Sequence, residues 1–473
     1  MSKHTKRTNK LIPMRTPTLF VLSLALLSAL DLPAQGRGRR GRQARPQARP
    51  TAPPEPKKEE KKQEPKSYTA IVGGDVYIGT GQRLTGATVL IADDKIDKVG
   101  HNLTLPDGTT IIDAKGKTVS PGFCIVEGSG MGAGFRGPFK DTVNPFAPDI
   151  KQGLAAGITS FLVGSTSSRG KIGGSNAVIK LAYGDVEGMV LTENSVVGIS
   201  VPLKRTDREN LEKSVKAAKD YLAALEGDAA AKAKDPAAKP TSKPKGSEQI
   251  LSVLQGKSRL WVVLGGGRSN MFRAMMGGAS SSSDVASIRE ACEIADLFGK
   301  GVVIQKPMSA WLIPDEIAAT DSSVIISPRT RSAADPKDPE RTGTNIATAA
   351  ILAKVGVPVA VTCPSGRFGG SGVGTNGILG QDLNTPNVDV AYAIRGGLDN
   401  RKALRTITLD AAEVMGISDR VGSIEEGKDA DILILDGDPL HYSTFVITAV
   451  VNGKVVYEKG KEALYRHIVR PKD

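Results

Sequence analysis

Short apolar runs recur through the middle of the chain, separated by segments with the periodicity of amphipathic helices. The runs are rich in Val, Ile and Leu, and they lie at 158–164, 259–266, 301–306, 323–328 and 358–364. Strands that are apolar on both faces are typical of a parallel sheet covered by helices. Helical patterns between them include 282–299 and 344–356. So many alternating units predict the α/β class, and they favour a closed (β/α)8 barrel over an open sheet.

Both ends of the folded part instead have the pattern of short strands with turn signals between them. In the segment 68–120, the dipeptide Asp93-Asp94 separates two predicted strands of a hairpin. Further strands are predicted at 429–440 and 445–460. Asn452-Gly453 is a strong signal for a two-residue hairpin turn. The two ends are therefore predicted to be β structure.

The first 34 residues have the layout of an export signal peptide. Residues 1–15 carry basic side chains and no acid, residues 19–30 are an uninterrupted apolar and small run, and cleavage is expected after Ala34. A membrane anchor is the alternative, but a helix over 19–30 would be only about 18 Å long, too short to span a bilayer. The sequence therefore predicts an exported protein, periplasmic or extracellular.

Residues 35–66 are rich in Arg, Pro, Lys and Glu, so a disordered linker is expected. Signal peptide and linker hold most of the net charge of +13, so the folded part is not predicted to bind nucleic acid. The basic linker can contact an anionic envelope surface, although a solvated tether is the simpler interpretation.

Residues 206–226 predict an amphipathic helix, and the low-complexity insert at 227–247 is interpreted as a mobile excursion.

Several stretches resemble the amidohydrolase superfamily, specifically its imidazolonepropionase-like and dihydroorotase-like branches. They are "GATVLIADDKIDKVG" and "IIDAKGKTVSPGF" near the front, "AAGITSFLVGSTSSRGKIGGSNAVIKL" at 155–181, and "ALRTITLDAAEVMGISDRVGSIEEGKDADILILDGDPL" at 403–440. The resemblance implies a metal-bearing (β/α)8 barrel, here 121–420, and a small composite β-sandwich from 67–120 plus 421–465. It also implies hydrolysis of C–N bonds other than peptide bonds, often in cyclic amides.

The resemblance further implies a metal centre whose usual ligands this sequence lacks. Family members commonly hold zinc or another divalent metal with four His and an Asp, beginning with a His-x-His pair in a "PGFIDxHxH" pattern. Here "PGFCIVEGSG" at 121–130 places Glu127 and Ser129 at the two His positions. The later ligand positions carry Gly265, Gly266, Gln305, Lys306 and Cys363. The chain's histidines all lie outside the barrel segment: His4, His101, His441 and His467. No cofactor is therefore predicted.

Three residues at the lost ligand positions are the catalytic candidates. Glu127 can serve as a general base, or it can pair with an arginine such as Arg136, Arg268 or Arg367. Ser129 as a nucleophile would need a partner base, and without a His only Lys306 is available. Cys363 is expected to face inward, because the resemblance places it at the position of an inward ligand. Because side chains alternate along a strand, Cys124, three residues before Glu127, is expected to face the helical shell. The candidate ligand-binding residues are Arg136, Gln305, Lys306 and Arg367.

Two function hypotheses follow, and a third is weaker. The first is a degenerate family member that keeps the barrel for binding a small molecule or for assembly, with an oligomer permitted. The second is an active hydrolase that uses Glu127 in an atypical metal-free or single-metal site. The third is a purely structural envelope protein tethered by its basic linker.

The leader generates the first testable prediction. Mature exported protein should begin near Gln35, and trypsin should cleave readily within 35–66, because a stretch rich in Arg and Lys without a core is accessible. N-terminal sequencing and mass spectrometry of limited digests measure both. Recovery of residues 1–34 in exported protein would contradict the signal peptide.

Overall fold

The computed structural model of the chain describes residues 66–134, 137–232, 242–265, 283–330, 332–363, 373–374, 386–463 and 466–467. The predicted signal peptide, residues 35–65 of the predicted linker and residues 233–241 of the predicted insert lie outside this part of the chain. None of the helices in the described part combines the length and the apolar character that a membrane crossing requires.

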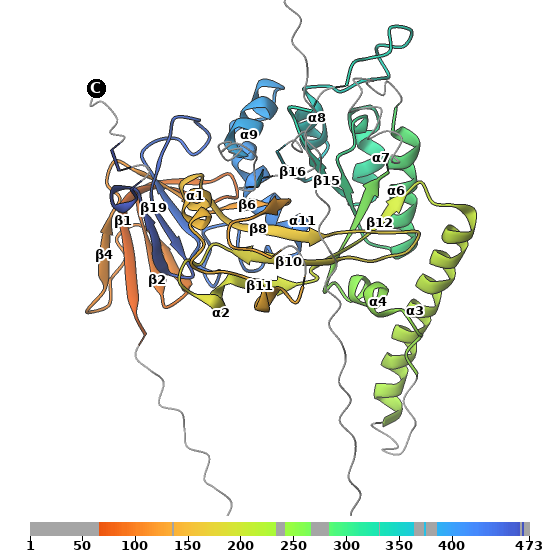
Figure 1. The fold of residues 1–473 in the computed structure, drawn as a ribbon, viewed down its shortest axis with the longest axis horizontal. Coiled ribbons are helices and arrows are strands. Elements are labelled where there is room, and N and C mark those ends of the chain that lie inside the picture. The colour runs from red at the N-terminus through yellow and green to blue at the C-terminus, as the bar shows by residue number, and fades with distance from the viewer. Residues whose placement is uncertain are drawn as a thin grey trace, which may run out of the picture. The chain divides into compact units, whose positions relative to one another are not determined.

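Strands from both ends of the chain form one hydrogen-bonded sheet of eight strands (Figure 1). They are β1 Tyr68–Tyr77, β2 Arg83–Ala92, β3 Lys95–Gly100, β4 Thr110–Asp113, β5 Thr118–Pro121, β18 Ile432–Leu435, β19 Val446–Val451 and β20 Lys454–Glu458. The antiparallel pairing of β5 with β18 joins the two groups. Buried side chains from both groups, including Ile71, Val119 and Ile434, form a single cluster, so the sheet closes over them as the predicted composite β-sandwich.

Both predicted hairpins are confirmed. The β2–β3 turn contains Asp93 at a φ of 56°, and the β19–β20 turn contains Asn452 at 50° and Gly453 at 72°. Asp, Asn and Gly tolerate this left-handed conformation better than other residues do. These turns could therefore be located from local sequence alone.

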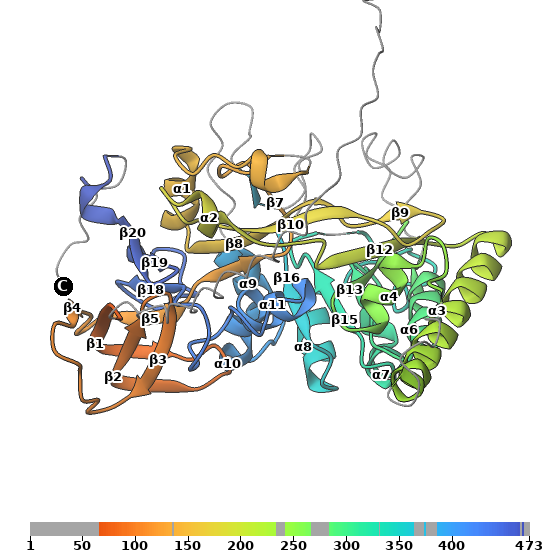
Figure 2. The same cartoon turned by 90° about the horizontal axis from the view of Figure 1, so that it is seen from below.

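The middle of the chain alternates strands and helices as predicted, which confirms the α/β barrel class (Figure 2). The parallel strands are β6 Phe123–Ile125, β8 Ile158–Ser165, β12 Val196–Val201, β13 Arg259–Leu264, β14 Val303–Gln305, β15 Ser323–Ile326 and β16 Val359–Val361. The main helices are α1 Asp149–Ala155, α3 Arg205–Lys232, α4 Glu248–Leu254, α6 Val285–Phe298, α7 Pro314–Ala319, α8 Thr348–Lys354, α9 Pro386–Arg395, α10 Asn400–Ala403 and α11 Leu409–Met415.

Two features depart from the predicted pattern. After β8 the chain turns back into β10 Ser175–Lys180, which is antiparallel to β8 and pairs in turn with β11 Val190–Glu193. The described barrel strands therefore fall into two hydrogen-bonded sheets, with β10 following β8 where a helix was expected. In addition, α3 continues to Lys232, so it enters the segment that was predicted to be a low-complexity insert.

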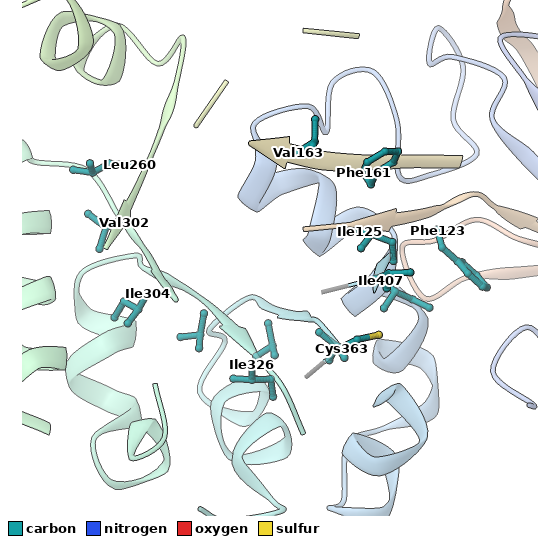
Figure 3. Close-up of a cluster of buried hydrophobic side chains, with 14 of the residues drawn as sticks. Phe123, Ile125, Phe161, Val163, Leu260, Val302, Ile304, Ile326, Cys363 and Ile407 are labelled. Carbon is teal, nitrogen blue, oxygen red and sulfur yellow. The ribbon is translucent and has the colours of Figure 1, made fainter. Parts of the chain in front are cut away.

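Alternate residues of the barrel strands belong to two separate apolar clusters. One contains Ile304, Ile326 and Cys363 together with residues of helices α6 to α9 (Figure 3). The other contains the opposite positions, such as Val303 and Ala360, together with residues of α11. The first cluster is the shell between strands and helices, and the second fills the interior of the barrel.

Helix α11 closes the barrel interior at the N-terminal ends of the strands. Its C-cap Gly416, at a φ of 73°, lies against Ser195 and Arg259, which precede or begin β12 and β13. The fully buried Trp261 of β13 donates its indole N–H to the carbonyl oxygen of Val414, 2.7 Å away. This bond satisfies the one polar group of the largest buried side chain.

A buried ion cluster fastens the barrel to the β-sandwich. Lys180 of β10, 1% exposed, places Nζ 2.7 Å from Asp429 Oδ2 and 3.0 Å from Asp431 Oδ2, and donates to Asn452 Oδ1 at 2.5 Å. Arg420 also binds Asp429 through two N–H groups. Burial alone would raise the pKa of Asp429, but its hydrogen bonds outweigh that effect and lower the pKa to about 2. This carboxylate therefore stabilises the fold above pH 4 and loses that contribution as the pH falls toward 2.

The second prediction concerns this ion cluster. Lys180→Met should lower the free energy of unfolding by about 3–5 kcal/mol, because the buried Asp431 loses its cation while Asp429 keeps Arg420 and Lys95. Urea denaturation measures the loss.

Lys454→Met is the matched control, since the Lys454–Asp185 pair is 3.1 Å long but its lysine side chain is 71% exposed. That variant should change stability by less than about 1 kcal/mol. Equal losses in the two variants would contradict the role given to the cluster.

Candidate active site

The C-terminal ends of β6 and β14 bring together the polar side chains of the barrel mouth. Glu127 follows β6 and is 9% exposed. Its Oε2 lies 2.6 Å from the ammonium of Lys306, and its Oε1 accepts a hydrogen bond from the amide of Gln305. The structure therefore brings together three of the residues singled out from sequence. The partner of Glu127 in the described part is a lysine, whereas an arginine was expected.

The backbone conformation of Lys306 directs its side chain toward the carboxylate of Glu127. Lys306 directly follows β14 and has a φ of 53°, in the left-handed region that a residue with a Cβ seldom adopts. Its N–H still donates to the carbonyl oxygen of Ile325, 2.8 Å away, so the residue remains attached to the neighbouring strand β15. Unfavourable backbone geometry of this kind concentrates at functional sites.

Ser129 lies beside this cluster on β7, Gly128–Ser129, which pairs in parallel with β17, Val373–Gly374. The N–H of Val373 donates to the carbonyl oxygen of Glu127 at 3.0 Å, so this short segment after β16 is attached at the site. Ser129 is half-buried. The described histidines lie on the sandwich and in the C-terminal part, so none is a partner base for it.

A cavity of about 410 Å³ opens next to Lys306, over the ends of β14 and β15. Trp311, Ile326 and several prolines supply its apolar surface, and hydroxyl and amide groups supply its polar surface. The polar lining comes from Ser327, Thr330, Thr342, Thr344, Asn345 and Thr348. Lys306 is the one charged residue of the described lining, and Glu127 balances it. The cavity therefore suits an uncharged, polar small molecule.

The expected direction of Cys363 was wrong. Its side chain lies in the shell cluster (Figure 3), with Asp389 of α9 nearby. Burial, and then the charge of Asp389, raise the pKa of the Cys363 thiol far above its ordinary value, so it is not a nucleophile at neutral pH. Cys124 was also assigned to the wrong side, because it lies in the interior cluster that contains α11.

Thr362 is the residue that sequence reasoning missed. It has the opposite direction to Cys363, in register with Ala360 of the interior cluster, and it is 2% exposed. Its Oγ1 has no hydrogen-bond partner among the described residues. The alternation of side chains along β16 would have pointed to Thr362 if Cys363 had been assigned to the outer side of the strand. Arg136, Arg268, Arg367 and Gly266 lie outside the described residues.

The side chains at the barrel mouth do not fit the metal centre that the resemblance implies. Both oxygens of Glu127 already accept from nitrogen donors, and a divalent cation there would meet the positive charge of Lys306 at short range. Gln305 and Ser129 add only neutral oxygens, which are poor ligands for zinc. Nowhere in the described ranges do three or more His, Cys, Asp or Glu side chains converge as a metal site.

Comparison with known proteins decides the family. The amidohydrolase family profile matches residues 150–462. The chain belongs to the amidohydrolase family. An amidohydrolase structure from Thermotoga maritima MSB8 is similar over 82% of this chain and 100% of its own, with 24% identity and a TM-score of 0.58. This likeness confirms the barrel and β-sandwich fold.

Curated relatives match over a short stretch. The imidazolonepropionase of Thermoplasma volcanium is 37% identical over 67 residues, covering 13% of this chain and 17% of the relative. That of Kosmotoga olearia is 35% identical over 71 residues, covering 14% of this chain and 18% of the relative. The chain thus matches less than a fifth of the length of these enzymes.

The third prediction tests whether the side chains at the barrel mouth hold a metal ion. Purified, tag-free protein should carry far less than one zinc, manganese or iron per chain, because Lys306 already neutralises Glu127, the carboxylate that the described residues place in the cluster. Elemental analysis after dialysis against a weak chelator measures this. One or two retained metals per chain would show that a cation displaces the lysine.

Proposed function

We propose that this protein is a degenerate amidohydrolase that binds a small molecule at its barrel mouth and does not hydrolyse it by the family's metal chemistry. The main observation that supports this proposal is the 2.6 Å contact between Lys306 and Glu127 at the ends of β14 and β6. The ammonium supplies the positive charge next to the carboxylate that a bound metal would otherwise supply. A lysine, however, cannot lower the pKa of a bound water as a divalent metal does.

The neighbouring cavity supports binding of a neutral amide-like compound. A cyclic amide offers both carbonyl oxygens and N–H groups, which match the ammonium and the hydroxyl oxygens of the lining. Trp311 and Ile326 provide apolar surface for the ring. The cavity of about 410 Å³ has ample room for such a molecule.

A second candidate function is favoured by the same contact. Glu127 is buried and hydrogen-bonded, so it could take a proton from water while Lys306 stabilises a developing oxyanion. This is metal-free hydrolysis of C–N bonds. Each oxygen of Glu127 makes one bond in the structure and has a second lone pair for a water. We place this function second because Lys306 is already paired with the carboxylate, so less of its charge is available to an oxyanion.

The proposed setting is outside the cytoplasm, in the periplasm or beyond. Its support is the basic and apolar pattern of residues 1–34, with the basic segment 35–66 as a tether that can touch an anionic surface.

The fourth prediction separates binding from catalysis, with hydantoin and dihydrouracil as probes. Wild-type protein should bind at least one of them in calorimetry and open neither ring. Lys306→Met should weaken binding at least about tenfold, because the ligand loses its charged donor. Lys300→Met, at an exposed position outside the cavity lining, is the matched control and should bind as the wild type does.

Glu127→Gln decides between the two functions, since it keeps the size of the side chain and removes its titratable carboxylate. Ring opening by the wild type that disappears in Glu127→Gln, with the circular dichroism spectrum unchanged, would make this protein a hydrolase. Failure of the wild type to bind either probe would overturn the proposed ligand class.

A further inference from the structure

The segment that follows β14 is attached to a carboxylate outside the cluster at the barrel mouth. Pro307 has no backbone N–H, so Met308 and Ser309 carry the first two backbone donors beyond Lys306. Both N–H groups donate to Asp284, that of Met308 to Oδ2 and that of Ser309 to Oδ1, each at 2.8 Å. One carboxylate therefore accepts from two successive residues and fixes this segment to the start of α6.

Asp284 does not cap the helix that it precedes. It is the N-cap residue of α6, where an aspartate ordinarily accepts a hydrogen bond from the N–H of the second or third helical residue. Among the described residues its carboxylate accepts no such bond, and the N–H of Val285 donates instead to the hydroxyl of Ser283 at 3.3 Å. In return, the hydroxyl of Ser309, which is 1% exposed, accepts the N–H of Asp284 at 3.4 Å. The carboxylate of Asp284 is thus directed to the segment after β14.

Lys306 depends on this attachment because its backbone has an unfavourable conformation. Its φ of 53° lies in the left-handed region, which a residue with a Cβ keeps only where its surroundings hold it. Before Lys306, the bond from its own N–H to Ile325 holds the chain; after it, the two bonds to Asp284 do so. Release of the second attachment would let the φ of Lys306 return to negative values and turn its side chain away from Glu127.

The same segment forms one wall of the cavity at the barrel mouth. Lys306, Pro307 and Met308 line this cavity, and Asp284 is not part of its lining. Asp284 therefore reaches the site only through the backbone of the wall. A substitution of Asp284 leaves the composition of the lining unchanged, so its effect on the site reports the position of the wall alone.

We propose that Asp284 is a positioning residue of the barrel mouth, which holds Lys306 in the left-handed conformation that brings its ammonium to Glu127. The proposal rests on the proposed binding function, in which this ammonium is the charged donor to the ligand. It makes ligand affinity depend on a carboxylate that does not contact the ligand.

The first test needs no ligand. The full chain is acetylated with an N-hydroxysuccinimide ester, and the rate at each lysine is measured by peptide mass spectrometry. Asp284→Asn keeps the size of the side chain but leaves one oxygen for two N–H groups. Acetylation of Lys306 should become at least about fivefold faster, because its ammonium is no longer held against the carboxylate of Glu127. The exposed Lys300 should react at the same rate in both proteins.

Asp399→Asn is the matched control, because Asp399 is the exposed N-cap residue of α10 and accepts the N–H of Arg401 at 2.8 Å. It makes the same swap at another helix start and should leave the rate at Lys306 unchanged. Asp284→Ser separates the proposed role from the stability of α6, because serine is a good N-cap residue but its one oxygen cannot accept both bonds. It should accelerate Lys306 as Asp284→Asn does. An unchanged rate at Lys306 in both Asp284 variants would overturn the proposal.

The second test asks whether Asp284 acts through Lys306 in ligand binding, with hydantoin and dihydrouracil as probes in calorimetry. Asp284→Asn should weaken binding at least about fivefold in the wild-type background and less than about twofold in the Lys306→Met background, because its effect requires the lysine. Equal weakening in both backgrounds would assign Asp284 a purely structural role and overturn the proposal. If the wild type binds neither probe, the proposed ligand class fails, and the acetylation rates still decide the role of Asp284.

Discussion

The antiparallel pairing of β5 with β18 is the constraint on which the rest of this structure depends. It joins strands that are more than three hundred residues apart in the chain, with Ser120 opposite Leu433 in its register. Once both ends share a sheet, the chain between them has to leave from β5 and return to β18. That return places α11 at the N-terminal ends of the barrel strands and Asp429 over Lys180. This one strand pairing therefore determines how the barrel is closed and how it is attached to the β-sandwich.

The barrel mouth holds a carboxylate, an amide and an ammonium in mutual contact. In this fold, residues at the C-terminal ends of the strands converge on one site, and Glu127, Gln305 and Lys306 do so here. The proposed binding function depends on this contact, because a lysine balances the charge of the carboxylate but cannot lower the pKa of a bound water as a divalent metal does.

Two cavities of different character follow from this arrangement. The one at the mouth is nearly neutral, because Glu127 balances Lys306 and the remaining lining is hydroxyl, amide and apolar. The one at the domain junction is lined by three charged residues, Arg83, Arg401 and Asp438. The cavity at the mouth is built within the barrel, whereas the junction cavity joins residues of the β-sandwich to residues of α9 and α10.

The amino-acid sequence by itself determined the order of strands and helices, both hairpins and the absence of histidine from the barrel, because these depend on neighbouring residues or on composition. It did not determine side-chain direction at the strand ends. Side chains alternate regularly from Phe123 to Val126, but the chain bends at 126–127, so counting back from Glu127 placed Cys124 on the wrong side. Cys363 was misplaced because it was aligned with an inward ligand of the family pattern, whereas it lies beyond the end of β16 at Val361, on the side of the shell cluster. The antiparallel return of β10 and the pairing of Lys306 with Glu127 were likewise decided only by tertiary structure, because hydrogen bonds and charges between distant strands select them.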